Sequence, residues 1–95
     1  MAIQSYKPQN KKELALAQAF LKLKTQQDIL NFLRDLLTQP EIEEFANRLE
    51  IARLLTKGVS YLKIAKQTGV STTTVTRVAQ WLNNGCGGYQ KVLEE

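Results

Sequence analysis

The sequence predicts an all-α fold organised around a helix-turn-helix, with no strands. Three observations support this prediction. Residues 60–82 have the spacing of a helix-turn-helix, four expected helices begin after a recognisable cap, and the first half of the chain holds two helices with very broad apolar faces. A length of 95 residues leaves no room for a second core, so we expect a single domain over residues 1–95.

Residues 1–10 contain Pro8 and show little periodicity, which favours a flexible arm. Two short helices are expected next, one over about Lys11–Lys22 and one that begins after the cap Thr25. Their apolar positions are Leu14, Leu16, Ala17, Phe20, Leu21 and Leu23, then Ile29, Leu30, Phe32, Leu33, Leu36 and Leu37. A short helix that is apolar over so wide an arc must be buried on several faces. Two subunits achieve this more easily than one small monomer, so we favour dimerisation through residues 11–56 over an ordinary core.

The longest helix is expected over about Gln39–Thr56. Thr38-Gln39-Pro40-Glu41 has the T-x-x-E pattern of a capping box, with proline inside the first turn. The expected core stripe contains Ile42, Phe45, Ala46, Leu49 and Ala52, with Ile51, Leu54 and Leu55 beside it. Lys57 and Gly58 end this helix.

Residues 57–82 are predicted to form the helix-turn-helix. Ser60 can cap a first helix, Tyr61–Gln67, and Thr68-Gly69 makes the turn because glycine takes a positive φ without steric cost. Ser71 can cap a second helix, Thr72–Leu82, by accepting a bond from a free backbone N–H. The side chains expected to face inward are Ile64, Ala65, Val70, Val75 and Val78.

Residues 83–95 are expected to form a loop and a short tail. Three glycines in four residues, Gly85, Gly87 and Gly88, cannot propagate a helix. In the tail, Tyr89, Val92 and Leu93 are expected to dock onto the core, which is favoured over fraying.

The outer side of the second helix is polar and carries Thr72, Thr73, Thr76, Arg77 and Gln80. A helix with an apolar inner face and a short hydrogen-bonding outer face can enter a DNA major groove. We predict that the threonines face base edges and that the other two residues lie further along the helix, near phosphate. Two alternatives are a helical hairpin whose polar face is merely solvated, and a dimeric adaptor that docks a protein partner through the same surface.

The distribution of charge supports a nucleic-acid partner. Net charge is +4, and no acidic residue occurs between Glu50 and Glu94. A one-sided positive field is what phosphate binding requires. The expected phosphate clamps are Lys57, Lys63 and Lys66. Ser71 acts as a cap first, and its backbone N–H can also meet a phosphate.

Other functional classes lack sequence support. No run of about 18 apolar residues exists, so no membrane span is expected. The first residues lack an apolar signal core, and the single Cys86 fits a reducing compartment, so we expect a cytoplasmic protein. The chain has no histidine and no metal-ligand spacing, so neither an enzyme nor a metal site is expected.

From Leu36 to Trp81 the chain resembles the tryptophan repressor family, and more closely its small YerC/YecD-type relatives. The shared features are Leu36-Leu37-Thr38, Arg48, Ile51, Leu54-Leu55, Lys57-Gly58, Gly69 and Thr74 to Arg77. The stretch between Gly58 and Gly69 is one residue shorter than in the repressor. The resemblance implies an all-helical, intertwined homodimer that acts as a transcriptional repressor. The helix-turn-helix motifs of its two subunits would lie about 34 Å apart, in successive major grooves.

The resemblance also implies a ligand pocket. In the repressor two arginines sandwich bound tryptophan, and Arg48 and Arg77 match them, while Thr38 matches a threonine near the polar end of the ligand. Val78 replaces a glycine and Trp81 replaces a ligand-contacting serine, and both changes add bulk. We therefore expect no cofactor and no need for free L-tryptophan, although another small effector stays an alternative.

Overall fold

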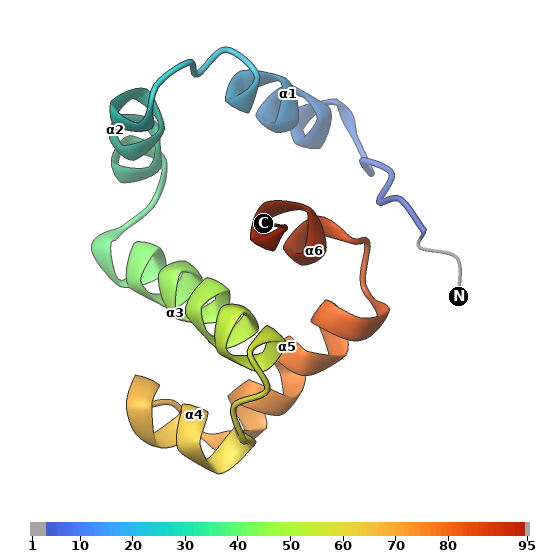
Figure 1. Ribbon diagram of the computed structural model, residues 1–95. Helices are drawn as coiled ribbons and strands as arrows, with labels where there is room; N and C mark the ends of the chain where they lie inside the picture. The colour runs from blue at the N-terminus through green and yellow to red at the C-terminus, as the bar shows by residue number, and fades with distance from the viewer. Residues whose placement is uncertain (1–3, 95) are drawn as a thin grey trace. The chain divides into compact units, whose positions relative to one another are not determined.

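The computed structural model describes residues 4–94 and contains helices and no strands in that range, which confirms the all-α prediction (Figure 1). The first residues of the predicted arm, 1–3, lie outside the described residues. The helices are α1 (Lys11–Phe20), α2 (Gln26–Leu36), α3 (Gln39–Thr56), α4 (Tyr61–Thr68), α5 (Thr72–Asn84) and α6 (Gly88–Leu93). None of the helices in this range is long and apolar enough to cross a bilayer.

The predicted caps form at the helix starts. Glu41 N donates to Thr38 Oγ1 over 3.3 Å, and Thr38 N donates to Glu41 Oε1 over 2.9 Å, so the capping box is complete. Ser60 Oγ accepts from the Lys63 backbone and Ser71 Oγ from the Thr74 backbone, each at 3.2 Å. The other capped starts are those of α1, by Asn10, and α2, by Thr25. Short polar side chains therefore fix where these helices begin.

Helix boundaries differ from the sequence expectation in four places, one of which is the end of α4 at Thr68 instead of Gln67. The first helix ends at Phe20 instead of Lys22, because its last turn tightens into bonds such as Leu21 N to Gln18 O at 3.1 Å. The second helix of the helix-turn-helix continues to Asn84. The tail is helical from Gly88, because glycine is tolerated at the first position of a helix.

The chain divides into two compact units, Tyr6–Glu43 and the part from Glu44 onward. Within Tyr6–Glu43 the ring centroids of Phe20 and Phe32 lie 5.3 Å apart, edge to face. Neither α1 nor α2 contains a buried residue. Their large exposed apolar side chains are Leu14, Leu16, Phe20, Leu21 (just after α1), Ile29, Leu30 and Leu36.

The unit from Glu44 onward holds the hydrophobic core. It is a cluster from α3, α4 and α5 that contains Ile51, Ala52, Ile64, Val75 and Val78. Burial of such side chains is the main stabilising term in a domain of this size.

The core stripe predicted for α3 is only partly correct. Ile51 and Ala52 are buried, but Phe45 and Leu49 remain 48% and 43% exposed. The core lies at the C-terminal end of α3, where α4 and α5 pack, so earlier apolar residues of α3 are left uncovered.

The docking predicted for the tail is also partly correct. Tyr89 and Leu93 pack against the core, whereas Val92 stays 68% exposed. A helix of this length, lying on the surface of the core, presents only one side to it.

Gly69 closes the turn between α4 and α5 with φ +77°. We expect Gly69→Ala to lower the free energy of unfolding by about 1–2 kcal/mol, because a Cβ disfavours the left-handed region. The space around the added Cβ is empty, so backbone strain is the whole effect. Urea unfolding measures it, and Gly88→Ala, at a glycine without positive φ, is the matched control. Equal stability of both variants would contradict this account of the turn.

Hydrogen bonds from the backbone N–H and the hydroxyl of Thr38 hold the pKa of the Glu41 carboxyl below its ordinary value of 4.5. A lowered pKa stabilises the fold above the unfolded value, and this stabilisation is lost as pH falls through the folded value. We expect wild type to exceed Glu41→Gln in thermal stability at neutral pH by an amount that shrinks below pH 4.5. Glu43→Gln is the control. A difference in thermal stability between wild type and Glu41→Gln that stays the same in acid would contradict this expectation.

Candidate nucleic-acid interface

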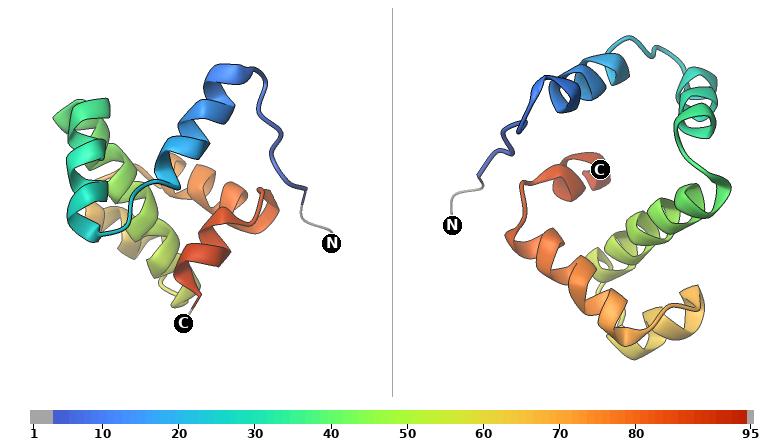
Figure 2. Two further views of the ribbon diagram at one scale, coloured as in Figure 1. Left: turned by 90° about the horizontal axis from the view of Figure 1, so that it is seen from above. Right: turned by 180° about the vertical axis from the view of Figure 1, so that it is seen from behind.

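Helices α4 and α5 meet across a tight turn, as the helix-turn-helix prediction requires (Figure 1 and Figure 2). Gly69 N donates to Ala65 O over 2.9 Å and ends α4. On α5 the buried side chains are Val75, Val78, Ala79 and Leu82, and Ile64 of α4 is fully buried against this face. The inward side of the reading helix is therefore fixed by apolar packing.

The opposite side of α5 is open to solvent. The exposed residues there are Thr72, Thr73, Thr76, Arg77 and Gln80, the same set that was predicted to read DNA. Thr76 Oγ1 donates to Thr72 O over 3.0 Å, so its proton is used within the helix. A threonine oxygen that donates in this way can still accept a bond from the amino group of a base, and a threonine methyl group can contact a thymine methyl.

The half-buried Thr74 was not predicted as part of this region. Its Oγ1 lies 3.1 Å from Ser71 Oγ, beside the bond that caps α5. Ser71 is thus engaged as a cap, as expected, and Thr74 supports it.

The basic residues predicted to contact phosphate lie around this helix pair. Lys57 follows α3, and Lys63 and Lys66 lie on α4; all three side chains are exposed. Two carboxylates of α3, Glu44 and Glu50, pair with arginines of the same helix. Arg53 Nε and Nη2 donate to Glu50 at 2.7 and 2.8 Å, which lowers the pKa of the Glu50 carboxyl.

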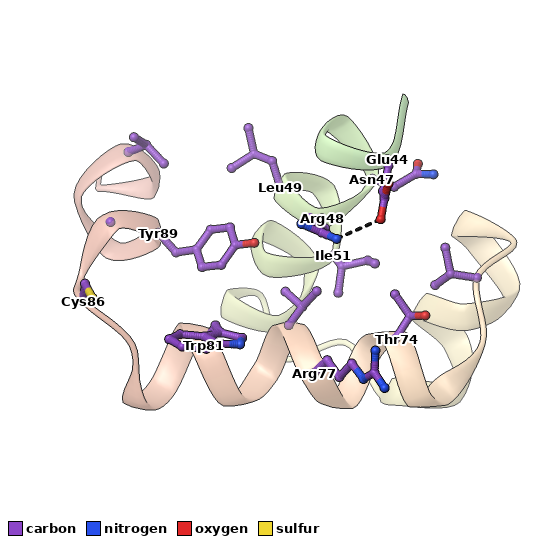
Figure 3. Close-up of a pocket in the computed structure, with 14 residues that line it drawn as sticks. Glu44, Asn47, Arg48, Leu49, Ile51, Thr74, Arg77, Trp81, Cys86 and Tyr89 are labelled. Atoms are coloured by element: carbon purple, nitrogen blue, oxygen red, sulfur yellow. Dashed lines mark hydrogen bonds and ion pairs between the residues drawn. The ribbon is translucent and has the colours of Figure 1, made fainter. Parts of the chain in front are cut away.

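A pocket of about 900 Å³ lies between α3, α5 and α6 (Figure 3). Four of the residues predicted for a ligand pocket, Arg48, Arg77, Val78 and Trp81, line it. Thr38 does not line it and instead serves the capping box of α3. Lining residues that sequence reasoning did not assign to it include Glu44, Asn47, Thr74, Cys86 and Tyr89. The glycine-rich loop and the apolar tail predicted that this segment docks onto the core. They gave no sign that it would form a wall of the pocket.

The two bulky residues in the pocket behave differently. Val78 belongs to the hydrophobic core and is only 5% exposed. Trp81 lines the pocket but remains 64% exposed, so its ring borders the space without filling it.

The two arginines differ as well. Arg48 Nη2 lies 2.8 Å from Glu44 Oε1, and its guanidinium carbon is 5.6 Å from the centre of the Phe45 ring. Arg77 projects from α5, beside the predicted reading face (Figure 3). Cys86 is an exposed free thiol at the end of the pocket near α6. Across the described residues, no group of His, Cys, Asp and Glu is arranged to hold a metal ion.

Comparison with known proteins decides the family. The sequence model of the family described as Trp repressor protein matches residues 11–95. The chain belongs to the Trp repressor family. Membership suggests a DNA-binding regulator, since this family is one of regulatory proteins and not of enzymes.

Individual relatives and solved structures support the same family assignment. The Bacillus subtilis (strain 168) protein YerC, itself uncharacterized, is 42% identical over 79 residues, which is 83% of this chain and 76% of YerC. A TrpR-like protein from Eubacterium eligens ATCC 27750 superposes with a TM-score of 0.85 at 38% identity, over 90% of this chain and 89% of the other. A candidate Trp repressor from Staphylococcus aureus superposes with a TM-score of 0.83 at 30% identity, over 90% of this chain and 86% of the other.

Proposed function

We propose that this Trp repressor family protein is a sequence-specific transcriptional repressor of the cytoplasm that binds double-stranded DNA as a homodimer, with α5 in the major groove. The observation that carries the proposal is the two-sided character of α5. Its inner face is buried in the core, and its outer face presents Thr72, Thr73 and Thr76 to solvent. Short side chains let a helix backbone approach the base edges closely.

Surface charge supports contact with the DNA backbone. Lys57, Lys63 and Lys66 surround the helix pair and are exposed. Such contacts fix register and supply most of the salt-dependent affinity, whereas the threonine face supplies discrimination among sequences. The free N–H groups at the start of α5, next to Ser71, suit a phosphate as well.

The uncovered apolar surface supports the homodimer. No residue of α1 or α2 is buried within one chain, although both helices are rich in leucine, isoleucine and phenylalanine. Contiguous apolar surface of this kind marks an interface in proteins that stay in solution. A second copy of the chain carries the same apolar helices and is therefore the partner that matches this surface.

We further propose that repression needs no free L-tryptophan. Val78 and Trp81 add bulk to the pocket wall between α3 and α5, and Thr38 is held by Glu41 at the start of α3. Val78 and Trp81 stand where the repressor pattern has a glycine and a ligand-contacting serine, so the contacts that the repressor makes with bound tryptophan are not reproduced here.

Selection of bound duplexes from a random pool tests the function. We expect a two-fold-symmetric consensus whose halves lie about one helical turn apart. Analytical ultracentrifugation of the free protein is expected to give twice the mass of one chain. Failure to enrich any sequence, with a gel shift absent at both low and moderate salt, would overturn the proposal and favour a protein partner for the same surface.

Lys63→Ala is expected to weaken binding evenly across sequences. Each lost phosphate contact reduces the slope of log affinity against log salt by about one, and a dimer loses two such contacts. Titrations at several salt concentrations measure the slope. Lys24→Ala, outside the helix-turn-helix, is the control. An unchanged slope in Lys63→Ala would remove this residue from the interface.

Calorimetric titration with L-tryptophan is expected to give no saturable heat at micromolar ligand. Affinity of the selected duplex is expected to be the same with and without added tryptophan. Trp81→Ser combined with Val78→Gly, which restores the small residues of the repressor pattern, is the informative variant. Saturable binding by the wild-type protein would refute tryptophan independence.

A further inference from the structure

Helix α6 is held in a defined place beside α5. Gln90 Nε2 donates to Leu82 O, one of the carbonyl groups near the end of α5. Tyr89 and Leu93 pack against the core cluster, whereas Val92 on the same helix remains 68% exposed. One side of α6 is therefore docked and the other faces solvent.

The turn that leads to α6 passes very close to α5. Gly85 N donates to Trp81 O over 3.0 Å, and a Cβ built on Gly85 would lie only 2.3 Å from that oxygen. A real side chain cannot occupy that position without moving the chain. The absence of a side chain at Gly85 thus allows α6 to fold back over the core.

Tyr89 extends from α6 into the space between α3 and α5. The helices whose backbones run closest along α5 are α4 and α6, so α3 is joined to α5 mainly through side chains. Those side chains include the buried Ile51 and Val78, and beyond them lies the pocket. Figure 3 shows the Tyr89 ring reaching across this pocket toward α3, on the side of Arg48 and Ile51.

We propose that Tyr89 is a positioning residue that fixes α5 against α3 and so sets the affinity for DNA. The inference rests on the proposed function, and its structural basis is that Tyr89 both lines the pocket and packs against the core. A tyrosine ring is rigid and has few rotamers, so a docked ring holds two helices apart at little entropic cost. Without it, α5 would sample more than one orientation, and only a fraction of the molecules would be ready to bind.

Full-length Tyr89→Ala, Tyr89→Phe and Leu93→Ala separate this role from general stability. Leu93 packs against the same core from the same helix but does not line the pocket. Each variant is titrated with the selected duplex at a temperature at which circular dichroism shows it to be folded. Thermal unfolding of each is recorded in parallel, and amide hydrogen exchange along α5 is measured without DNA.

We expect Tyr89→Ala to bind DNA about tenfold more weakly, as when only about a tenth of the molecules are binding-competent. Tyr89→Phe is expected to restore binding to within about twofold of wild type, because the ring and not the hydroxyl fills the space. Leu93→Ala should lose thermal stability yet bind as wild type does. Equal loss of affinity in Tyr89→Ala and Leu93→Ala, or wild-type affinity in Tyr89→Ala, would overturn the proposal.

The exchange measurement keeps this inference distinct from the function on which it rests. If the wild-type protein selects no duplex, DNA binding fails, but amide exchange still shows whether Tyr89 holds α5. Faster exchange along α5 in Tyr89→Ala than in Leu93→Ala supports the positioning role. Equal exchange in these two variants overturns it, whatever the protein binds.

Discussion

The contact of Ile51, Ile64, Val75 and Val78 is the constraint on which the rest of the structure depends. These side chains come from three different helices, so their mutual burial brings α3, α4 and α5 together. The polar outer face of α5 follows from this, because an α-helix that buries one stripe must present the opposite stripe to solvent. The surface that we propose for DNA reading is in this sense the reverse side of a hydrophobic core.

Local chemistry made the helix starts predictable from the sequence. Ser60, Thr38 and Ser71 each cap a helix through a bond to a backbone N–H three residues later, and Gly69 takes the positive φ expected of it. The exposed threonine face also followed from spacing, since Val75 and Val78 had to point inward. These features depend on neighbours within a few residues, which a sequence displays directly.

Features that depend on distant contacts were harder to predict. Phe45 and Leu49 belong to an apolar stripe but stay largely exposed outside the core, and no local signal marks where a core ends. Trp81 was expected to add bulk to the ligand pocket, but no local signal showed that its ring would be largely exposed on the pocket wall. The docked Tyr89 depends on the close passage of Gly85 over Trp81 O, which is a three-dimensional condition invisible in the spacing of glycines.

The placement of Tyr89 within the pocket has a consequence for how such a regulator would be controlled. A repressor that waits for a metabolite reports the level of that metabolite, because its active fraction follows ligand concentration. A chain in which Tyr89 takes the role that we propose would carry no such sensor. Its operator occupancy would follow the number of protein copies in the cell, and through dimer formation it would do so steeply, so synthesis and turnover of the protein would become the input signal.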